Sequence, residues 1–181
     1  MIILASASPR RKQLLNEICP SFLIYPANID EEAYPKEEVS YQKAVVIGDK
    51  YPDDIIISAD TIVILDNIIF GKPINEQDAY RILKILSNKT HQVITYYTIY
   101  CKNKKINISK ECITHVTFNP LSDELINAYI KSKSPLDKAG AYGYQDNEKY
   151  HLVKDIVGSK TNVIGFPIEE IKQELINLKI I

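Results

Sequence analysis

Hydroxyl and guanidinium groups are concentrated at the start of the chain, directly after the short apolar run at residues 2–4. They are Ser6, Ser8, Arg10 and Arg11. Ser8 is a favourable N-cap, and Pro9 suits the first helical position because its missing N–H would have no partner there. Helix N-termini attract anions, and arginine adds a planar fork that matches phosphate oxygens. The stretch therefore indicates a phosphate site, although a capped surface helix with solvated arginines explains it equally well.

A carboxylate inside a strongly apolar stretch is the second candidate group. Asp60 follows isoleucines at 55–57 and small residues at 58–59, and the apolar pattern resumes at 62–65. Burying a carboxylate costs free energy unless it is paired or binds a metal ion. We therefore favour a functional role for Asp60. A bend at which the strand reaches the surface is the alternative.

Further charged residues complete a basic set and an acidic set. Lys43 and Lys72 join the two arginines, and the acidic run Asp30, Glu31 and Glu32 joins Asp60. Such a combination suits a nucleoside triphosphate with a divalent cation, because cations hold phosphates and carboxylates hold Mg²⁺. A carboxylate also orients and deprotonates an attacking water molecule.

A glycine-rich aromatic segment at residues 137–146 is suited to a flat ligand. Gln145 within it offers both a hydrogen-bond donor and an acceptor, so this segment is a candidate for holding a base. By itself the segment is more typical of an ordinary turn-rich loop. The tripeptide Gly71-Lys72-Pro73 is likewise a weak signal on its own.

Alternating strand and helix patterns must position these groups. Apolar and β-branched runs predict strands at residues 2–4, 22–25, 55–65, 68–70, 90–101, 106–118 and 150–157. Helical patterns follow Ser8 and occupy residues 37–50, 75–88, 122–131 and about 168–178. The order of these elements predicts an α/β fold, with an antiparallel hairpin over residues 90–118.

The amino-acid composition narrows the classes of protein to which this chain can belong. The chain has 181 residues, 45% of them hydrophobic and 25% charged, which suits one domain, or one domain with two lobes, and disfavours disorder. No apolar run approaches the length of a membrane span, and the N-terminus lacks the features of a signal peptide. The net charge of −1 argues against a long nucleic-acid footprint.

Cysteine and histidine spacing does not favour a zinc site or a disulfide framework. Three cysteines (Cys19, Cys101 and Cys112) form no CxxC pair, so reduced thiols in a cytoplasmic protein fit best. The three histidines are far apart, which favours structural roles over metal binding. The phosphate-binding pattern GxxxxGK[ST] and a GxGxxG after the first strand are both absent, which disfavours ordinary nucleotide motors and dinucleotide enzymes.

Several ordered motifs resemble the Maf family of nucleoside triphosphate pyrophosphatases over nearly the whole chain. The first is Leu4-Ala5-Ser6-Ala7-Ser8-Pro9-Arg10-Arg11. The others follow in family order: Asp30-Glu31, Lys43-Ala44, Ser58-Ala59-Asp60-Thr61, Gly71-Lys72-Pro73, and residues 90–93, 137–145 and 163–167. Ordered motifs spread over a whole chain are far more specific than any one of them, so they strengthen the interpretation of the N-terminal stretch as a phosphate site.

The resemblance implies a fold and a reaction. The fold is one domain over residues 1–181, similar to ITPase-like proteins, with two lobes around an elongated mixed sheet, flanking helices and a cleft between the lobes. The reaction is hydrolysis of a nucleoside triphosphate to the monophosphate and pyrophosphate with Mg²⁺ or Mn²⁺. A homodimer is also consistent with the resemblance, whereas neither nucleic acid nor a membrane is an expected partner.

The resemblance also assigns roles to residues of this sequence. The groups expected to hold the triphosphate are Ser6, Arg10, Arg11, Lys43 and Lys72. Glu31 and Asp60 are expected to bind the metal ion and, with Lys43, to carry out catalysis, and Asp60 is our first choice as general base. Thr61 would support that site. Because Ser8 is occupied as the helix cap, we favour Ser6 over Ser8 as the phosphate ligand.

Base preference follows from the segment around Gln145. Its tyrosine-glycine-X-glutamine pattern resembles the subgroup that acts on dTTP and UTP rather than the subgroup that acts on 7-methyl-GTP. A glutamine amide can pair with the O4 and N3 edge of a uracil-type base. Asp146 stands where the family usually has glycine, and this extra carboxylate is expected to alter base preference. The alternative function is a non-catalytic nucleotide-binding regulator of cell division and septum formation. The presence of both Glu31 and Asp60 favours the enzyme.

Overall fold

A computed structural model describes all residues from 1 to 181 and contains one mixed sheet of seven strands. The strands are β1 (Ile2–Leu4), β2 (Leu23–Ile24), β3 (Ile55–Leu65), β4 (Ile68–Phe70), β5 (Thr90–Cys101), β6 (Ile106–Phe118) and β7 (Val153–Val157). Their order is β2-β1-β3-β5-β6-β7, and β4 pairs with β3. Parallel pairs join β1 to both β2 and β3, and antiparallel pairs join β3 to β4 and β6 to β7.

The five helices that the sequence patterns predict are present, together with two short helices that were not predicted. The α-helices are α1 (Pro9–Ile18), α2 (Lys36–Lys50), α3 (Glu76–Leu86), α4 (Asp123–Lys131), α5 (Asn147–Tyr150), α6 (Lys160–Ile164) and α7 (Ile168–Asn177). Short 3-10 turns are η1 (Glu31–Ala33), η2 (Ser134–Asp137), η3 (Ala139–Ala141) and η4 (Tyr144–Asp146). The predicted α/β class is therefore confirmed. No helix combines the length and the apolar character that crossing a membrane requires.

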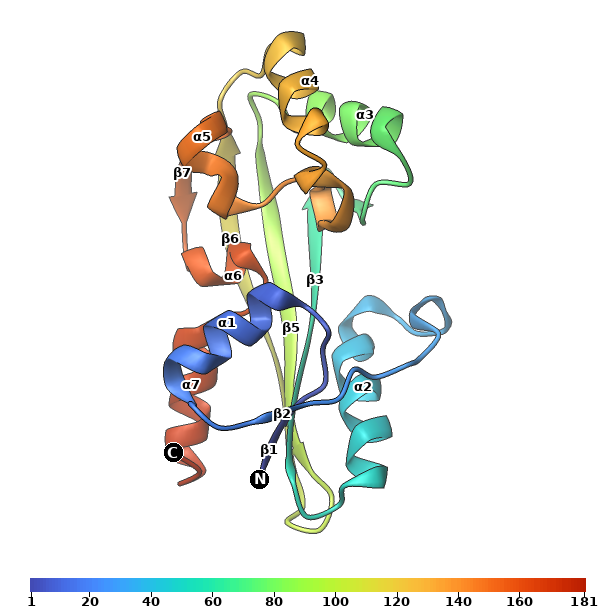
Figure 1. The fold of residues 1–181 in the computed structure, drawn as a ribbon, viewed down its shortest axis with the longest axis vertical. Helices are drawn as coiled ribbons and strands as arrows, with labels where there is room; N and C mark the ends of the chain where they lie inside the picture. The colour runs from blue at the N-terminus through green and yellow to red at the C-terminus, as the bar shows by residue number, and fades with distance from the viewer. The chain divides into compact units, whose positions relative to one another are not determined.

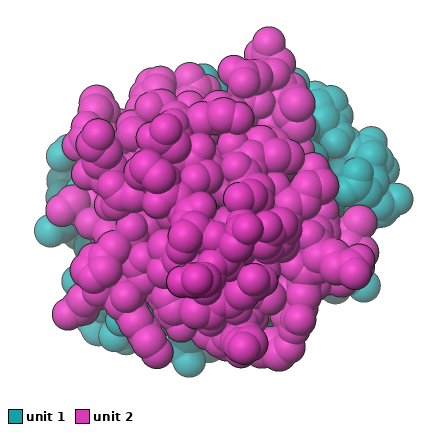
Figure 2. Space-filling model, turned by 90° about the horizontal axis from the view of Figure 1, so that it is seen from above, with its two compact units in different colours: residues 1–60, 95–112, 165–181 teal, residues 61–94, 113–164 magenta.

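The chain divides into two compact units (Figure 2). Unit 1 comprises Met1–Asp60, Thr95–Cys112 and Gly165–Ile181. Its core includes Ile3, Ala44, Ile47 and Ile56, and α1 packs beside α7 (Figure 1). This arrangement places the start of α1, the end of the β3 segment of unit 1 and α2 in one compact body.

Unit 2 comprises Thr61–Ile94 and Ile113–Ile164. Its core includes Val63, Leu83, Phe118 and Tyr129, and α3 lies against α4 (Figure 1). The boundary between the units falls between Asp60 and Thr61, inside β3. The single domain over residues 1–181 and the cleft stay predictions.

Strand β3 excludes one of the two explanations for a carboxylate at position 60, and the functional role stays a prediction. It runs unbroken through residues 58–61, so a bend at Asp60 is not what places this carboxylate. The turn at Asp66 and Asn67 has positive φ angles of 51° and 63°, a conformation that Asp and Asn tolerate better than most residues. The strand and the tight turn into β4 are therefore local consequences of the sequence.

Two segments in the C-terminal third differ from their predicted structure. The strand expected to begin at residue 150 begins at Val153, because residues 147–150 form α5, which His151 caps with a φ of 51°. Residues 160–164 form α6, a short helix that the helical patterns of the sequence do not include. Periodicity over so few residues does not separate a helical turn from a strand.

Candidate functional site

Ser8 and Ser6 are both hydrogen-bonded at the start of α1. Ser8 Oγ accepts from Arg11 N at 3.4 Å, which confirms the predicted N-cap. Ser6 Oγ accepts from Ser8 N at 3.2 Å and from Arg11 Nη1 at 3.4 Å. Ser8 is therefore committed to the helix end, while Ser6 lies directly against the Arg11 guanidinium. Its role as a phosphate ligand stays a prediction.

Arg11 is held by a residue far along the chain. Its Nε donates to the carbonyl oxygen of Gly165 at 2.9 Å. Burial lowers the pKa of Arg11 to about 10, and the neighbouring charge of Asp60 acts in the opposite direction. The guanidinium remains protonated at neutral pH. Arg10 lies in the same turn, where its charge also lowers the pKa of Arg11.

Glu31, Lys43 and Asp60 form the charged centre of unit 1. Lys43 Nζ lies 2.7 Å from Glu31 Oε1 and 3.8 Å from Asp60 Oδ1. The side chains of Lys43 and Asp60 are only 12% and 15% exposed, whereas that of Glu31 is 45% exposed. One ammonium group thus connects a largely buried carboxylate to a carboxylate at the surface.

Local structure explains how these side chains are presented. Asp30 Oδ1 accepts from Glu32 N at 3.2 Å and caps η1, the short turn that begins with Glu31. Lys43 lies in α2, whose neighbouring residues Ala44 and Ile47 are buried in the core. The helix therefore fixes the base of the lysine side chain, while the ammonium group reaches the two carboxylates.

The environment of Asp60 disfavours its charged form. Burial raises the pKa of the Asp60 carboxyl above its ordinary value, although the charges of Lys43 and Arg11 act in the opposite direction. A carboxylate that is poorly solvated and not fully neutralised has a greater tendency to accept a proton. Asp60 is therefore suited chemically to act as a general base.

The donor set of unit 1 fits a hard divalent cation only in combination with a ligand. Glu31 and Asp60 offer carboxylate oxygens, but no group of three or more His, Cys, Asp or Glu residues is arranged to hold a metal. Mg²⁺ is commonly held by one or two carboxylates together with water and substrate phosphates. The residues present fit that arrangement.

The other predicted residues belong to unit 2. Thr61 directly follows Asp60 on β3, while Lys72 and Gln145 are exposed. Gly140 N donates to the carbonyl oxygen of Gly71 at 3.1 Å, which joins the segment carrying Lys72 to the segment carrying Gln145. The structure therefore brings together the predicted groups of unit 1 in one cluster and links Lys72 to the base segment in unit 2.

The side chain of Gln145 lies against Gly143, where the absence of a Cβ atom leaves room for its amide. A Cβ atom on Gly143 would lie 2.9 Å from Gln145 Oε1 and 2.7 Å from Lys138 Cε. Any side chain at position 143 would displace one of these two groups. The glycine at this position therefore serves the placement of the Gln145 amide.

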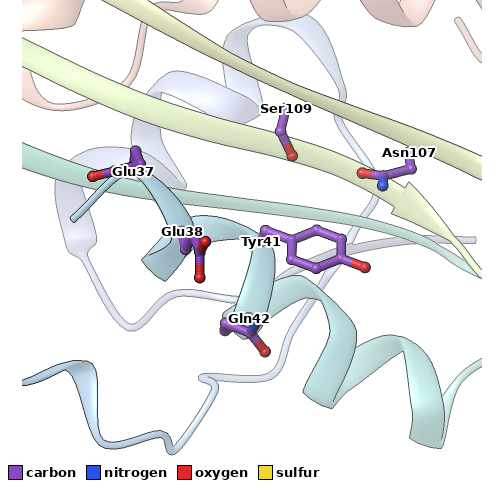
Figure 3. Close-up of a pocket in the computed structure, with 6 residues that line it drawn as sticks. All are labelled: Glu37, Glu38, Tyr41, Gln42, Asn107 and Ser109. Atoms are coloured by element: carbon purple, nitrogen blue, oxygen red, sulfur yellow. The ribbon is translucent and has the colours of Figure 1, made fainter. Parts of the chain in front are cut away.

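A polar pocket elsewhere in unit 1 contains none of the predicted residues. Figure 3 shows α2 on one side and β6 on the other, with the Tyr41 ring between them. Its lining residues are Glu37, Glu38, Tyr41, Gln42, Asn107 and Ser109. The predicted groups cluster around Lys43 and Arg11 instead, so this pocket is separate from the candidate site.

An α/β chain that gathers arginine, lysine and carboxylate groups in this way is suited to phosphate anhydride chemistry. The family described as Maf-like protein matches residues 1–178. The chain therefore belongs to the Maf family, as its motifs predict.

Relatives of similar length carry a specific name. A protein of Thermosipho africanus strain TCF52B, named dTTP/UTP pyrophosphatase, is 47% identical over 176 residues, which cover 94% of this chain and 89% of that protein. A protein of Ruminiclostridium cellulolyticum with the same name is 42% identical over 190 residues, covering 99% of this chain and 98% of its own. A third, from Geobacter sulfurreducens, is 40% identical over 181 residues, covering 96% and 94%.

Gly165 belongs to a predicted motif, but the sequence assigns it no role of its own. Its φ of 118° lies in a region that L side chains rarely adopt, and its carbonyl oxygen holds Arg11. We expect Gly165→Ala to lower the free energy of unfolding by about 1–3 kcal/mol through backbone strain. It should also raise the KM for nucleoside triphosphate about tenfold, because Arg11 loses its anchor.

Gly158→Ala is a matched control for this prediction. Gly158 also has a positive φ, 129°, and a Cβ there would lie 2.8 Å from Thr114 Oγ1. This variant should lose stability in the same way but keep the KM of the wild type. Thermal unfolding and steady-state kinetics of both variants decide the question. A Gly165→Ala variant with an unchanged KM would show that Arg11 does not depend on this carbonyl.

Proposed function

We propose that this protein hydrolyses nucleoside triphosphates, dTTP and UTP foremost, to the nucleoside monophosphate and pyrophosphate. The observation that carries the proposal is the placement of Lys43 between Glu31 and the buried carboxylate of Asp60. The printed names of the relatives support the substrate class. Modified pyrimidine nucleotides belong to the same proposal, which would give the protein a house-cleaning role.

The basic groups bind the phosphate chain. Arg11 is fixed by Gly165 and Ser6, so its guanidinium is oriented before the substrate arrives. Arg10, Lys43 and Lys72 add positive charge, and Ser6 adds a hydroxyl. Pre-oriented cations bind anions with less loss of side-chain entropy than free surface residues do.

Asp60 acts as the general base. It takes a proton from a water molecule, whose oxygen forms a bond to the α-phosphorus. The bond between the α-phosphorus and the oxygen bridging to the β-phosphorus then breaks, and that oxygen leaves with pyrophosphate. Lys43 neutralises negative charge beside the reacting group, and Thr61 supports the position of Asp60. A carboxylate with a raised pKa suits this transfer.

Glu31 and Asp60 would hold Mg²⁺ or Mn²⁺ together with phosphate oxygens. When bound, the metal ion would neutralise phosphate charge and polarise the attacked phosphoryl group. Lys43 must then share its carboxylate partners with the ion.

The three cysteines form no disulfide, which supports the further proposal of a cytoplasmic location.

Product analysis tests the proposed function directly. Purified protein is incubated with Mg²⁺ and a panel of triphosphates (dTTP, UTP, dCTP, dATP and dGTP), and pyrophosphate is assayed separately from phosphate. We expect monophosphate and pyrophosphate in equal amounts, with the highest kcat/KM for dTTP and UTP. Release of single phosphates would contradict the pyrophosphatase reaction. Tight nucleotide binding without turnover would favour a regulator of cell division.

A further inference from the structure

The phenol of Tyr129 ties both ends of the turn that carries Gln145. Tyr129 lies on α4 and is fully buried. Its Oη donates to Asp146 Oδ2 at 2.7 Å and accepts from Gly143 N at 3.0 Å. Gly143 and Asp146 flank Gln145 at a distance of one or two residues, so one hydroxyl group fixes the turn on both sides of the amide.

The Asp146 carboxylate accepts a hydrogen bond from a second hydroxyl group. Ser134 Oγ donates to the same oxygen, Asp146 Oδ2, at 2.7 Å. Lys138 Nζ in turn donates to Ser134 O at 2.7 Å and to Ser134 Oγ at 2.9 Å. The Asp146 carboxylate is thus directed toward α4 and η2 by two hydroxyl donors. The expected influence of Asp146 on base preference can therefore act through the turn that it holds.

The hydrogen bonds on Gly143 and Asp146 matter because the turn that they hold would otherwise be flexible. Gln145 is exposed at the centre of η4, a single 3-10 turn, and a lone turn of this kind has little stability of its own. An amide distinguishes bases only if its distance from the base edge is fixed, because a mobile amide adapts to several partners. The ties on Gly143 and Asp146 supply that restriction.

We propose that Tyr129 and Asp146 are positioning residues that set the base selectivity of this enzyme by fixing the turn that presents Gln145. The inference rests on the proposed function and deepens it. The sequence singled out Asp146 as an extra carboxylate beside the base segment. The hydrogen bonds explain what that carboxylate does, because they replace backbone freedom with a fixed turn.

Tyr129→Phe removes both ties and keeps the shape of the ring. We expect the KM for dTTP and UTP to rise about tenfold and kcat to change less than about threefold, because the phosphate-binding groups of unit 1 are untouched. The preference for dTTP over dGTP in kcat/KM should fall by a similar factor.

Asp146→Ala should act in the same direction as Tyr129→Phe. Asp146→Asn should stay near the wild type, because its amide oxygen still accepts from both hydroxyls.

Tyr80→Phe is the matched control. Tyr80 Oη donates to Asp123 Oδ1 at 2.7 Å, so this variant also loses a hydrogen bond from tyrosine to aspartate within unit 2. The pair lies on α3 and at the start of α4 and takes no part in the hydrogen bonds that tie Gly143 and Asp146. We expect both its KM values and its base preference to equal those of the wild type.

A double-mutant cycle with Gln145→Ala separates positioning from general stability. If Tyr129 acts through Gln145, Tyr129→Phe should change base preference less than about twofold once Gln145 is alanine. Additive effects would overturn the inference, as would wild-type selectivity in Tyr129→Phe. Should Tyr129→Phe fail to fold, Asp146→Ala, whose side chain lies at the partly exposed end of the turn, serves in the same cycle.

Measurements of nucleotide binding distinguish a failure of this inference from a failure of the proposed function. The same variants are titrated calorimetrically with a non-hydrolysable α,β-imido analogue of dTTP and with the corresponding analogue of dGTP. A wild-type protein that binds the dTTP analogue without hydrolysing dTTP would overturn the proposed reaction, while the cycle in Kd still decides the role of Tyr129. A protein that binds neither analogue would overturn both.

Discussion

Asp60→Asn is expected to lower kcat for dTTP at least about a hundredfold, the scale on which a general base contributes. The substitution keeps the size and shape of the side chain but replaces a proton acceptor with an amide. Asp60 is the buried carboxylate of the cluster and lies 3.8 Å from Lys43 Nζ. Steady-state kinetics with pyrophosphate detection measures the change.

The pH dependence of kcat should carry the signature of the same carboxylate. A general base must be ionised, so activity falls as the pH falls through its pKa. Because burial raises the pKa of Asp60, the acid limb of the profile should lie at a higher pH than for an ordinary aspartate. Metal saturation must be maintained at each pH, because protonation also weakens the binding of a hard cation.

Asp49→Asn is the matched control for the catalytic prediction. Asp49 lies on α2, the helix of Lys43, and its Oδ1 forms an exposed ion pair with Lys102 at 2.7 Å. Its amide variant should retain the kcat and the pH profile of the wild type. Near-normal turnover in Asp60→Asn would reject Asp60 as the base, and Glu31→Gln would then become the variant to measure.

Acidification is expected to destabilise the protein through His91. This side chain is buried, and burial lowers its pKa to about 4. Its Nε2 shares a hydrogen bond of 2.6 Å with Tyr142 Oη, whereas its Nδ1 has no hydrogen-bond partner. The rings of Phe118 and Tyr142 pack edge-on against the imidazole. None of these neighbours compensates a positive charge.

The sign and size of the effect follow from linkage between protonation and folding. In the unfolded chain the histidine pKa is about 6.5, so the unfolded state binds more protons than the folded state between about pH 6.5 and pH 4. Stability therefore decreases as the pH falls through this window. The shift corresponds to about 3 kcal/mol by pH 4, since one pKa unit is worth about 1.4 kcal/mol.

His91→Gln isolates this contribution from that of titrating carboxylates. Urea unfolding is measured from about pH 7 to about pH 4 for the wild type, His91→Gln and His115→Gln. The stability advantage of the wild type over His91→Gln should shrink by about 3 kcal/mol across that range. His115 is exposed, so His115→Gln should follow the wild type. Parallel profiles for wild type and His91→Gln would contradict a neutral, buried His91.

Local patterns predicted much of the fold because the signals lie within a few residues. The Ser8 cap, the apolar stretch of β3 and the β5–β6 segments depend on neighbouring side chains and backbone preferences, and all were recovered. The segment at 137–146 was predicted only as a turn-rich loop, and the 3-10 turns within it were not. Its backbone depends on distant contacts, such as the approach of Gly140 to Val63.

The chemistry of the candidate residues was predictable from their types, but their partners were not. Asp60 was singled out because a carboxylate within an apolar strand needs a reason to be there. By contrast, the bond from Arg11 to Gly165 joins residues 154 positions apart, and no local pattern encodes such a pair. The same is true of the bond from Tyr129 to Asp146, since either residue alone resembles an ordinary core or surface residue.

The division of hydrogen bonds between the two units has an evolutionary consequence. Arg11 and Lys43 are held by partners within residues 1–60 and 165–181, whereas the turn of Gln145 is held by residues between 61 and 164. Under the proposed function, mutations that retune base preference can therefore accumulate in one part of the chain without disturbing the contacts that hold Arg11 and Lys43 in the other. New nucleotide specificities become accessible in small steps while the reaction itself stays the same.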